Sequence, residues 1–313
     1  MADTFFYEEL IYQAIASSMG LEPTSLRLFP TISLLNQDDY WLFNTFDIIP
    51  NSAPPFEINE TAPLLGNTYG ALLQSQPTSF PVTIAKKNFE NPAYWLPANT
   101  SLGLPKTPVY SPTSAGISNS IAGGASLDFE LDSSKYPSPV DVLYPSFPSF
   151  VVNQPLRTFN QIAGEKPFVF TMHFDKVVSL PVRPGGWFSQ AVFAQAYQSG
   201  GKNWGTGPGT VTWDDLFGEN GILKFIYNGV LAISGIVLEL QSFGQYDSAI
   251  LDALNNAGAT SIWPFYLNIK NMTQQYALNE DGSIEITSQV PSPDILLLAM
   301  QAESIDNLLG NTA

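Results

Sequence analysis

One histidine, His173, stands close enough to an aspartate to support acid–base chemistry. His173 and Asp175 are two residues apart in a run with the composition of a β-strand, and alternate residues of a strand share a face. An imidazole oriented by a carboxylate is half of an acyl-transfer site. No Gly-x-Ser-x-Gly sequence supplies the nucleophile. A catalytic role for this pair therefore competes with the more common structural role of a lone histidine in an apolar strand.

Acidic residues beside tryptophan form a second candidate set, at Asp39 and at Asp214 and Asp215. Glycoside hydrolysis uses two carboxylates that flank the sugar bond. This pattern makes the three aspartates candidates for a carboxylate-based, glycan-active enzyme. The run 214–221 also carries oxygen ligands suited to calcium but lacks the EF-hand spacing, and aspartates in such positions often cap helices. We predict no metal site and no cofactor.

Aromatic residues in a glycine-rich stretch form the third set. They are Trp187, Phe188, Tyr197, Trp204 and Trp213. Rings on loops stack on sugars or on choline head groups, so we predict that these five bind the ligand. The alternative is that they anchor the core. The segment 200–209 lacks the Gly-Lys-Ser/Thr ending of a phosphate-binding loop.

The charge balance excludes several classes of partner. The chain has 12 basic and 28 acidic residues, for a net charge of −16, so it repels nucleic acid and anionic membranes. Glycan surfaces and neutral membrane surfaces stay open. The absence of cysteine and the single histidine exclude disulfides, thiol catalysis and a multi-histidine metal site within one chain.

The N-terminal residues resemble no export signal. Met1–Glu9 has no basic start and carries acids instead, and no apolar run approaches the ~20 residues of a membrane-spanning helix. We expect synthesis in the cytoplasm without a signal peptide and no transmembrane segment, with later release and extracellular action as an open alternative. The sequons at Asn59, Asn99 and Asn271 matter only on a secretory route.

The first half of the chain combines one helix with a proline-rich region. Residues 3–19 have helical spacing and end at Gly20. Seventeen of the 25 prolines fall in residues 50–167, which predicts extended segments and ordered loops without long helices. Within it, residues 111–126 are either a surface loop or a membrane-inserting hairpin. Leu127–Leu131 alternates as a half-buried strand does.

The second half predicts strands and hairpins. Asn228-Gly229 is the typical pair of a type I′ turn and predicts a hairpin, with a bulge at Gly235. Asp281-Gly282 predicts a second hairpin. The other expected elements are strands at 168–174 and 177–182, helices at 187–197 and 246–257, and a helix from Ser292 to Gly310, with a strand over 295–300 and a short helix as its alternative.

These patterns indicate a mainly β or α+β fold with antiparallel sheets, a β-sandwich being one arrangement, and with helices at both ends. We expect one domain over 1–313, or a proline-rich half at 1–160 and a hairpin-rich half at 161–313. The favoured function is a non-enzymatic recognition protein, lectin-like or toxin-like. The alternatives are a self-assembling, capsid-like or inclusion-forming subunit and the glycan-active enzyme. A homo-oligomer is expected.

Overall fold

The computed structural model describes residues 5–35, 38–52, 58–101, 103–135, 140–141, 158–159, 162–163, 165–207, 210–257 and 271–310. Its contacts divide the chain into two compact units. The first unit contains residues 1–35, 120–178 and 231–298, and the second contains 36–119, 179–230 and 299–313. The units therefore alternate along the chain, whereas the sequence suggested one domain or a break near residue 160.

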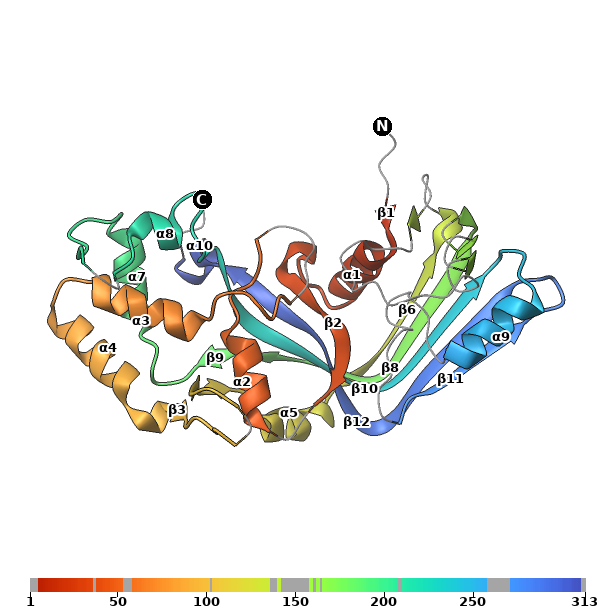
Figure 1. The fold of residues 1–313 in the computed structure, drawn as a ribbon, viewed down its shortest axis with the longest axis horizontal. Coiled ribbons are helices and arrows are strands. Elements are labelled where there is room, and N and C mark those ends of the chain that lie inside the picture. Colours follow the sequence, from red (N-terminus) through yellow and green to blue (C-terminus); the bar gives the residue numbers. More distant parts are fainter. Residues whose placement is uncertain are drawn as a thin grey trace. The chain divides into compact units, whose positions relative to one another are not determined.

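A six-stranded sheet is the largest feature (Figure 1). Its order is β11 (Thr273–Leu278), β12 (Ile284–Ser304), β10 (Phe225–Ser242), β8 (Phe168–Pro181) and β6 (Ala125–Asp132), and β2 (Leu26–Leu34) also pairs with β12. β11 with β12 and β6 with β8 are antiparallel. The α+β class with antiparallel sheets is confirmed. The described residues contain no second large sheet, so they do not form a β-sandwich.

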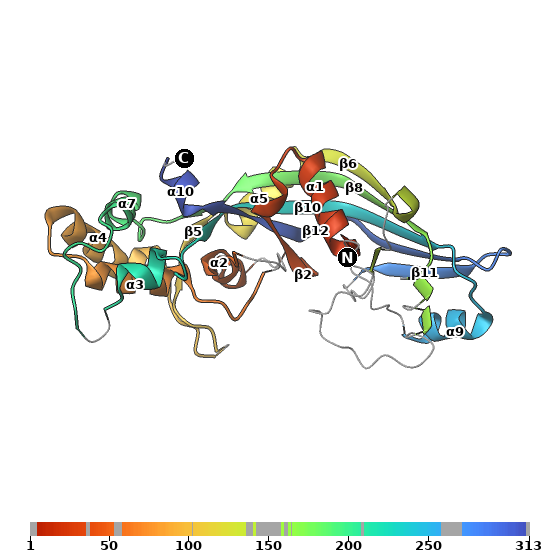
Figure 2. The same ribbon diagram turned by 90° about the horizontal axis from the view of Figure 1, so that it is seen from above.

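The first unit packs helices on this sheet. α1 (Tyr7–Ser18) lies across the sheet and contacts β6 and β2 (Figure 2). Gly20, which follows α1, has a φ of 65°, as expected for a glycine that caps the C-terminal end of a helix in the left-handed conformation. α9 (Ser248–Ala257) contacts β11. β8 buries alternate residues such as Phe170 and Met172, which is the period of a strand with one covered face. The helix predicted at 3–19 is confirmed over Tyr7–Ser18, with Phe5–Phe6 in a short strand before it, and the helix predicted at 246–257 is confirmed over Ser248–Ala257.

Helices are the main regular elements of the second unit. Its helices and short strands include α2 (Asp39–Asp47), α3 (Leu65–Ser75), α4 (Phe80–Glu90), most of α5 (Ser114–Ile121), α7 (Gln190–Gln198), α8 (Trp213–Phe217), α10 (Ile305–Leu308), β3 (Trp95–Leu96) with β4 (Thr107–Pro108), and β5 (Tyr110–Ser111) with β9 (Arg183–Pro184). α4 packs on α3 and α7, and α7 packs on α8. No helix of the described residues has the length and apolar character needed to cross a bilayer.

The prediction of extended segments and loops across 50–167 is wrong for α3 and α4. Prolines stand at the ends of these helices rather than inside them. Pro63 and Pro77 bracket α3, and Pro81 occupies the first turn of α4, where a missing N–H costs nothing. Ser79 caps α4 by accepting a hydrogen bond from the backbone of Val82.

Residues 111–126 form neither of the two predicted structures. Ser114–Ile121 is a helix, α5, with Ile117 fully buried. Ile117 and Ile121 are four residues apart, which is helical spacing, so small residues around them did not prevent a helix. Leu127–Leu131 lies in β6 as predicted.

The predicted hairpin at Asn228-Gly229 is wrong, because both residues lie inside the continuous strand β10 and neither has a positive φ. Asn228 Nδ2 donates to Glu303 Oε2 at 3.0 Å. A Cβ on Gly229 would lie 2.8 Å from Gln301 Oε1. Both residues therefore serve the packing of β10 against β12 rather than a turn.

The two other glycines predicted at irregular positions, Gly235 and Gly282, both have a positive φ. Gly235 has a φ of 64° within β10, and a Cβ there would lie 1.9 Å from Asp175 Oδ2, so the strand needs glycine where Asp175 approaches. The Asp281-Gly282 hairpin is confirmed, with Leu278 opposite Ile284 and a φ of 84° at Gly282.

At the C-terminal end the favoured helix from Ser292 is wrong, and the alternative of a strand and a short helix is confirmed as β12 and α10. Residues 296–300 of β12 are fully buried. A continuous apolar run of this kind fits a buried strand and a buried helix equally well.

Candidate functional site

His173 lies on the more exposed face of the sheet, between two carboxylates. Its Nδ1 lies 2.5 Å from Asp128 Oδ1 and its Nε2 lies 3.3 Å from Asp175 Oδ1. Asp128 comes from β6, directly opposite His173 in the register with β8. The sequence predicted the Asp175 contact and missed Asp128, because the pairing of two strands 45 residues apart is not visible in local spacing.

This environment does not resemble a general base. The hydrogen bond that the ring makes to Asp128, and after it the one to Asp175, raises the pKa of His173 above its usual value, and in its protonated form the ring donates to both carboxylates. A ring with both nitrogens engaged has no free lone pair to accept a proton. Within the described part of the chain, the ring nitrogens pair with carboxylates and not with a hydroxyl group.

The aspartates predicted as glycan-cleaving residues lie at helix ends and make hydrogen bonds there. Asp39 Oδ1 accepts hydrogen bonds from the backbone N–H and the hydroxyl of Ser114, at 2.7 and 2.5 Å, at the start of α5. Asp215 forms a capping box with Thr212 at the start of α8, and the hydrogen bond from the Thr212 backbone lowers the pKa of Asp215. Asp214 lies in the same first turn.

Trp187 belongs to the core of the second unit. It has no exposed surface, and its indole N–H donates to the carbonyl of Val109 at 2.8 Å. Five rings surround it with centroids between 5.5 and 6.4 Å away: Tyr69, Phe89, Trp95, Tyr110 and Phe188. Trp187 therefore has no face left for a ligand, and Phe188 is packed against it.

The remaining predicted rings gather elsewhere in the same unit, around Phe217. Ring centroids of Tyr197, Trp204 and Trp213 lie 5.2, 6.4 and 5.9 Å from that of Phe217. Their polar atoms have partners: Trp213 Nε1 donates to the Tyr197 carbonyl, Trp204 Nε1 to Ser199 Oγ, and Tyr197 to Asp306. These rings are only partly covered, so ligand binding by them stays a prediction, but their visible role is to hold α7 and α8 together.

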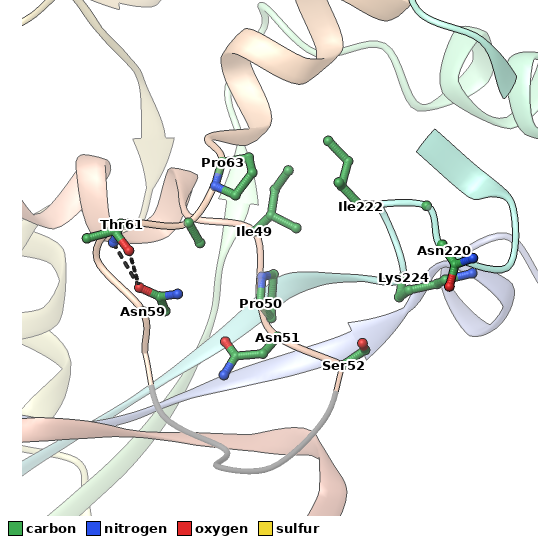
Figure 3. A pocket seen from close by; sticks show the side chains of 12 residues that line it. Ile49, Pro50, Asn51, Ser52, Asn59, Thr61, Pro63, Asn220, Ile222 and Lys224 are labelled. Carbon is green, nitrogen blue, oxygen red and sulfur yellow. Dashed lines mark hydrogen bonds between the residues drawn. The ribbon is translucent and has the colours of Figure 1, made fainter. Parts of the chain in front are cut away.

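A pocket of about 430 Å³ lies in the second unit (Figure 3). Its wall comes from the chain after α2, from residues 59–63, and from the chain after α8. The polar lining residues are Asn51, Ser52, Asn59, Thr61, Asn220 and Lys224, and the apolar ones include Ile49, Pro50, Pro63 and Ile222. No carboxylate is among the lining residues.

Backbone hydrogen bonds hold one wall of this pocket. Ile48 and Leu64 form a β-bridge, and the Ile49 N–H donates to the Pro63 carbonyl at 2.9 Å. Asn59 Oδ1 accepts hydrogen bonds from the N–H and the hydroxyl of Thr61, at 3.0 and 2.7 Å. This side-chain turn fixes the orientation of the Asn59 amide.

The facing wall is fixed in the same way. The N–H of Ile222 donates to the backbone carbonyl of Asp215 at 3.1 Å, and the N–H of Leu223 donates to the backbone carbonyl of Leu216 at 2.8 Å. The Lys224 amine donates to the Gly218 carbonyl. Hydrogen bonds thus position the side chains of Asn59, Thr61 and Lys224 before any ligand arrives, as is typical of small-molecule sites.

A buried carboxyl group anchors the helix that leads into the pocket. Asp47, the last residue of α2, is 1 % exposed. Its Oδ1 accepts hydrogen bonds from the Tyr110 hydroxyl at 2.6 Å and from the Gly66 N–H at 2.8 Å. Burial raises the pKa of Asp47 to about 6 and also raises the pKa of Tyr110. Because Gly66 is in the first turn of α3, Asp47 ties the end of α2 to the start of α3.

Sequence reasoning missed this pocket. Its only local signal was the Asn59-Glu60-Thr61 run, which was interpreted as a sequon, although the same residues also suit an Asx turn. Within the described part of the chain, no group of three or more acidic or histidine side chains is arranged to hold a metal ion. Comparison with protein-family models, curated proteins and solved structures finds no match, so function is argued from the residues themselves.

Proposed function

We propose that this protein is a non-enzymatic recognition protein that binds a glycan in the pocket of the second unit. The observation that supports this proposal is the lining of the pocket, in which amides and hydroxyls combine with apolar side chains and with no carboxylate. In a chain with 28 acidic residues, a lining without one is a distinctive feature.

Sugars need this combination of groups. Each sugar hydroxyl donates and accepts hydrogen bonds, and an asparagine side chain offers both a carbonyl acceptor and an NH₂ donor. The C–H faces of a sugar ring pack on apolar surface, for which Ile49, Pro50 and Ile222 are available. The volume of about 430 Å³ falls within the roughly 300–1,000 Å³ of small-molecule sites.

The same lining favours binding over hydrolysis. A glycosidase needs two carboxylates across the scissile bond, and the predicted candidates Asp39 and Asp215 are engaged at helix ends. The proposal therefore keeps the recognition function expected from the sequence and moves the ligand site from the aromatic residues to the pocket.

The test is a glycan array followed by calorimetry on the best ligand. Asn220→Ala removes a lining amide, and Gln74→Ala removes an exposed amide on α3 outside the pocket. The loss of one or two hydrogen bonds of about 1 kcal/mol each should weaken binding by roughly 10-fold in Asn220→Ala. Gln74→Ala should bind as the wild type does. A blank array, or equal binding by both variants, would contradict the proposal.

Self-assembly is a second candidate because α4 presents an exposed apolar face. Phe80 is 81 % exposed and Ile84, one turn later, is 43 % exposed, whereas Val82 and Ala85 on the other face are buried. Contiguous exposed apolar patches mark association surfaces, and we propose that Phe80 and Ile84 contribute to one. Light scattering should then show an oligomer in the wild type and a smaller species for Phe80→Ser. A monomeric wild type would exclude assembly.

A further inference from the structure

We infer that the glycan recognised by this pocket carries a single acidic group, which Lys224 binds. The inference rests on the proposed function and adds the chemical class of the sugar. Lys224 is the only charged residue among the twelve that line the pocket. Because basic residues number 12 against 28 acids in the chain, a charged lining residue would more commonly be an acid.

The bonding of Lys224 leaves it able to receive an anion. Its ammonium group has three donors, and the structure gives one of them to the Gly218 carbonyl. No ion pair in the described part of the chain involves Lys224. A compact ammonium group is a point charge that binds a carboxylate or a phosphate through charge-assisted hydrogen bonds.

Neighbouring amides suit the rest of such a ligand. Asn220 and Lys224 lie on one side of the pocket, and Asn59 and Thr61 lie on the other (Figure 3). Since Asn59 Oδ1 already accepts two hydrogen bonds from Thr61, the amide nitrogen is the part of Asn59 that remains for a ligand. Lys224 and two amides thus offer mostly donors, which fits a sugar with one anionic end.

Nearby acids limit the number of charges that the ligand can carry. Glu60 and Glu219 are exposed and adjoin lining residues in the sequence, and the whole chain carries −16. These charges act through solvent and are screened over about 8 Å at physiological ionic strength, whereas Lys224 would touch its partner. A sugar with one acidic group satisfies Lys224, and a polyanionic chain is repelled.

The experiment compares four ligands by calorimetry at fixed ionic strength: a neutral methyl hexoside, the matching hexuronic acid, the methyl ester of that acid, and the hexose phosphate. The wild type should bind one of the two acidic sugars at least 10-fold more tightly than the neutral ones. Lys224→Gln should remove this preference, and Lys224→Arg should retain most of it. The carboxylate and phosphate arms identify which anion is bound.

The outcomes separate the two proposals. If the wild type binds none of the four sugars and the glycan array is blank, the recognition function itself fails. If neutral and acidic sugars bind the wild type equally, the acidic-ligand inference fails while glycan recognition stands. Should Lys224→Gln not fold, the methyl ester decides in its place, because it removes the charge from the ligand. An ester that binds as tightly as the acid would overturn the inference.

Discussion

Replacing Asp47 with asparagine should remove a pH dependence that this buried carboxyl group imposes on stability. Asp47 is 1 % exposed, and burial raises its pKa from 3.8 to about 6. Asparagine has the same shape, stays neutral at every pH, and can accept the hydrogen bonds from Tyr110 and Gly66 through its carbonyl oxygen. It therefore imitates the protonated form of Asp47.

The direction of the effect follows from proton binding. Between pH 3.8 and about 6 the folded protein holds a proton on Asp47 that the unfolded chain releases, so the free energy of unfolding falls as the pH rises. This contribution is fully present below about pH 4 and is lost as the pH rises through the folded-state pKa of about 6. A pKa difference of about 2 corresponds to about 3 kcal/mol.

Urea denaturation of wild type and Asp47→Asn from pH 4 to pH 7.5 measures this difference directly. Across that range the free energy of unfolding of the wild type should fall by about 3 kcal/mol relative to that of the variant. Asp215→Asn is the control in the same unit. Because the pKa of Asp215 is lowered, its carboxylate stabilises the folded protein more as the pH rises, so the difference in free energy of unfolding between wild type and this variant should change with pH in the opposite direction. A flat difference curve for Asp47→Asn would refute the assignment of a desolvated, protonated carboxyl group.

Two further predictions concern His173 and the glycines. Because His173 is the single histidine, it should give one titrating imidazole signal in the NMR spectrum. The pKa of His173 should lie above its usual value in the wild type and should be lower in Asp128→Asn. An unchanged pKa in this variant would contradict the pairing with Asp128. Gly282→Ala should cost about 1–3 kcal/mol because the φ of Gly282 is 84°. Gly229→Ala should cost less than Gly282→Ala, because Gly229 has no positive φ and the atom nearest to an added Cβ is the flexible end of Gln301. The reverse order in urea denaturation would indicate a turn at Gly229.

The two Asx-Gly pairs show how far sequence reasoning extended to the fold. Asp281-Gly282 and Asn228-Gly229 carry the same local signal, and only the first is a turn. The difference is tertiary: Asn228 bonds Glu303 on β12, which no local window contains. Strand β6 and the Asp281-Gly282 hairpin were predictable because their burial or turn chemistry is local. The number of prolines in residues 50–167 led to the wrong prediction that this region lacks helices such as α3 and α4. A proline prevents a helix only when it lies inside the helix, not when it lies at an end.

The candidate site was less accessible to sequence reasoning than the fold. His173 and Asp175 were found because two residues on one strand share a face, whereas Asp128 depends on the strand register. Trp187 carries the same composition signal as a ligand-stacking ring and is wholly buried. Three separate segments form the pocket, and Asn59 and Asn220 come to line the same pocket only after these segments fold.

The alternation of the two units along the chain has a consequence for synthesis and folding. Strands β8, β10 and β12 each contribute residues to both units, so neither unit is complete until β12, near the end of the chain, has left the ribosome. Contacts between residues this far apart in sequence form slowly. Partly made chains would therefore expose the apolar strands β8 and β10 for as long as β12 is missing, and chaperone binding during translation should be most prominent in that interval.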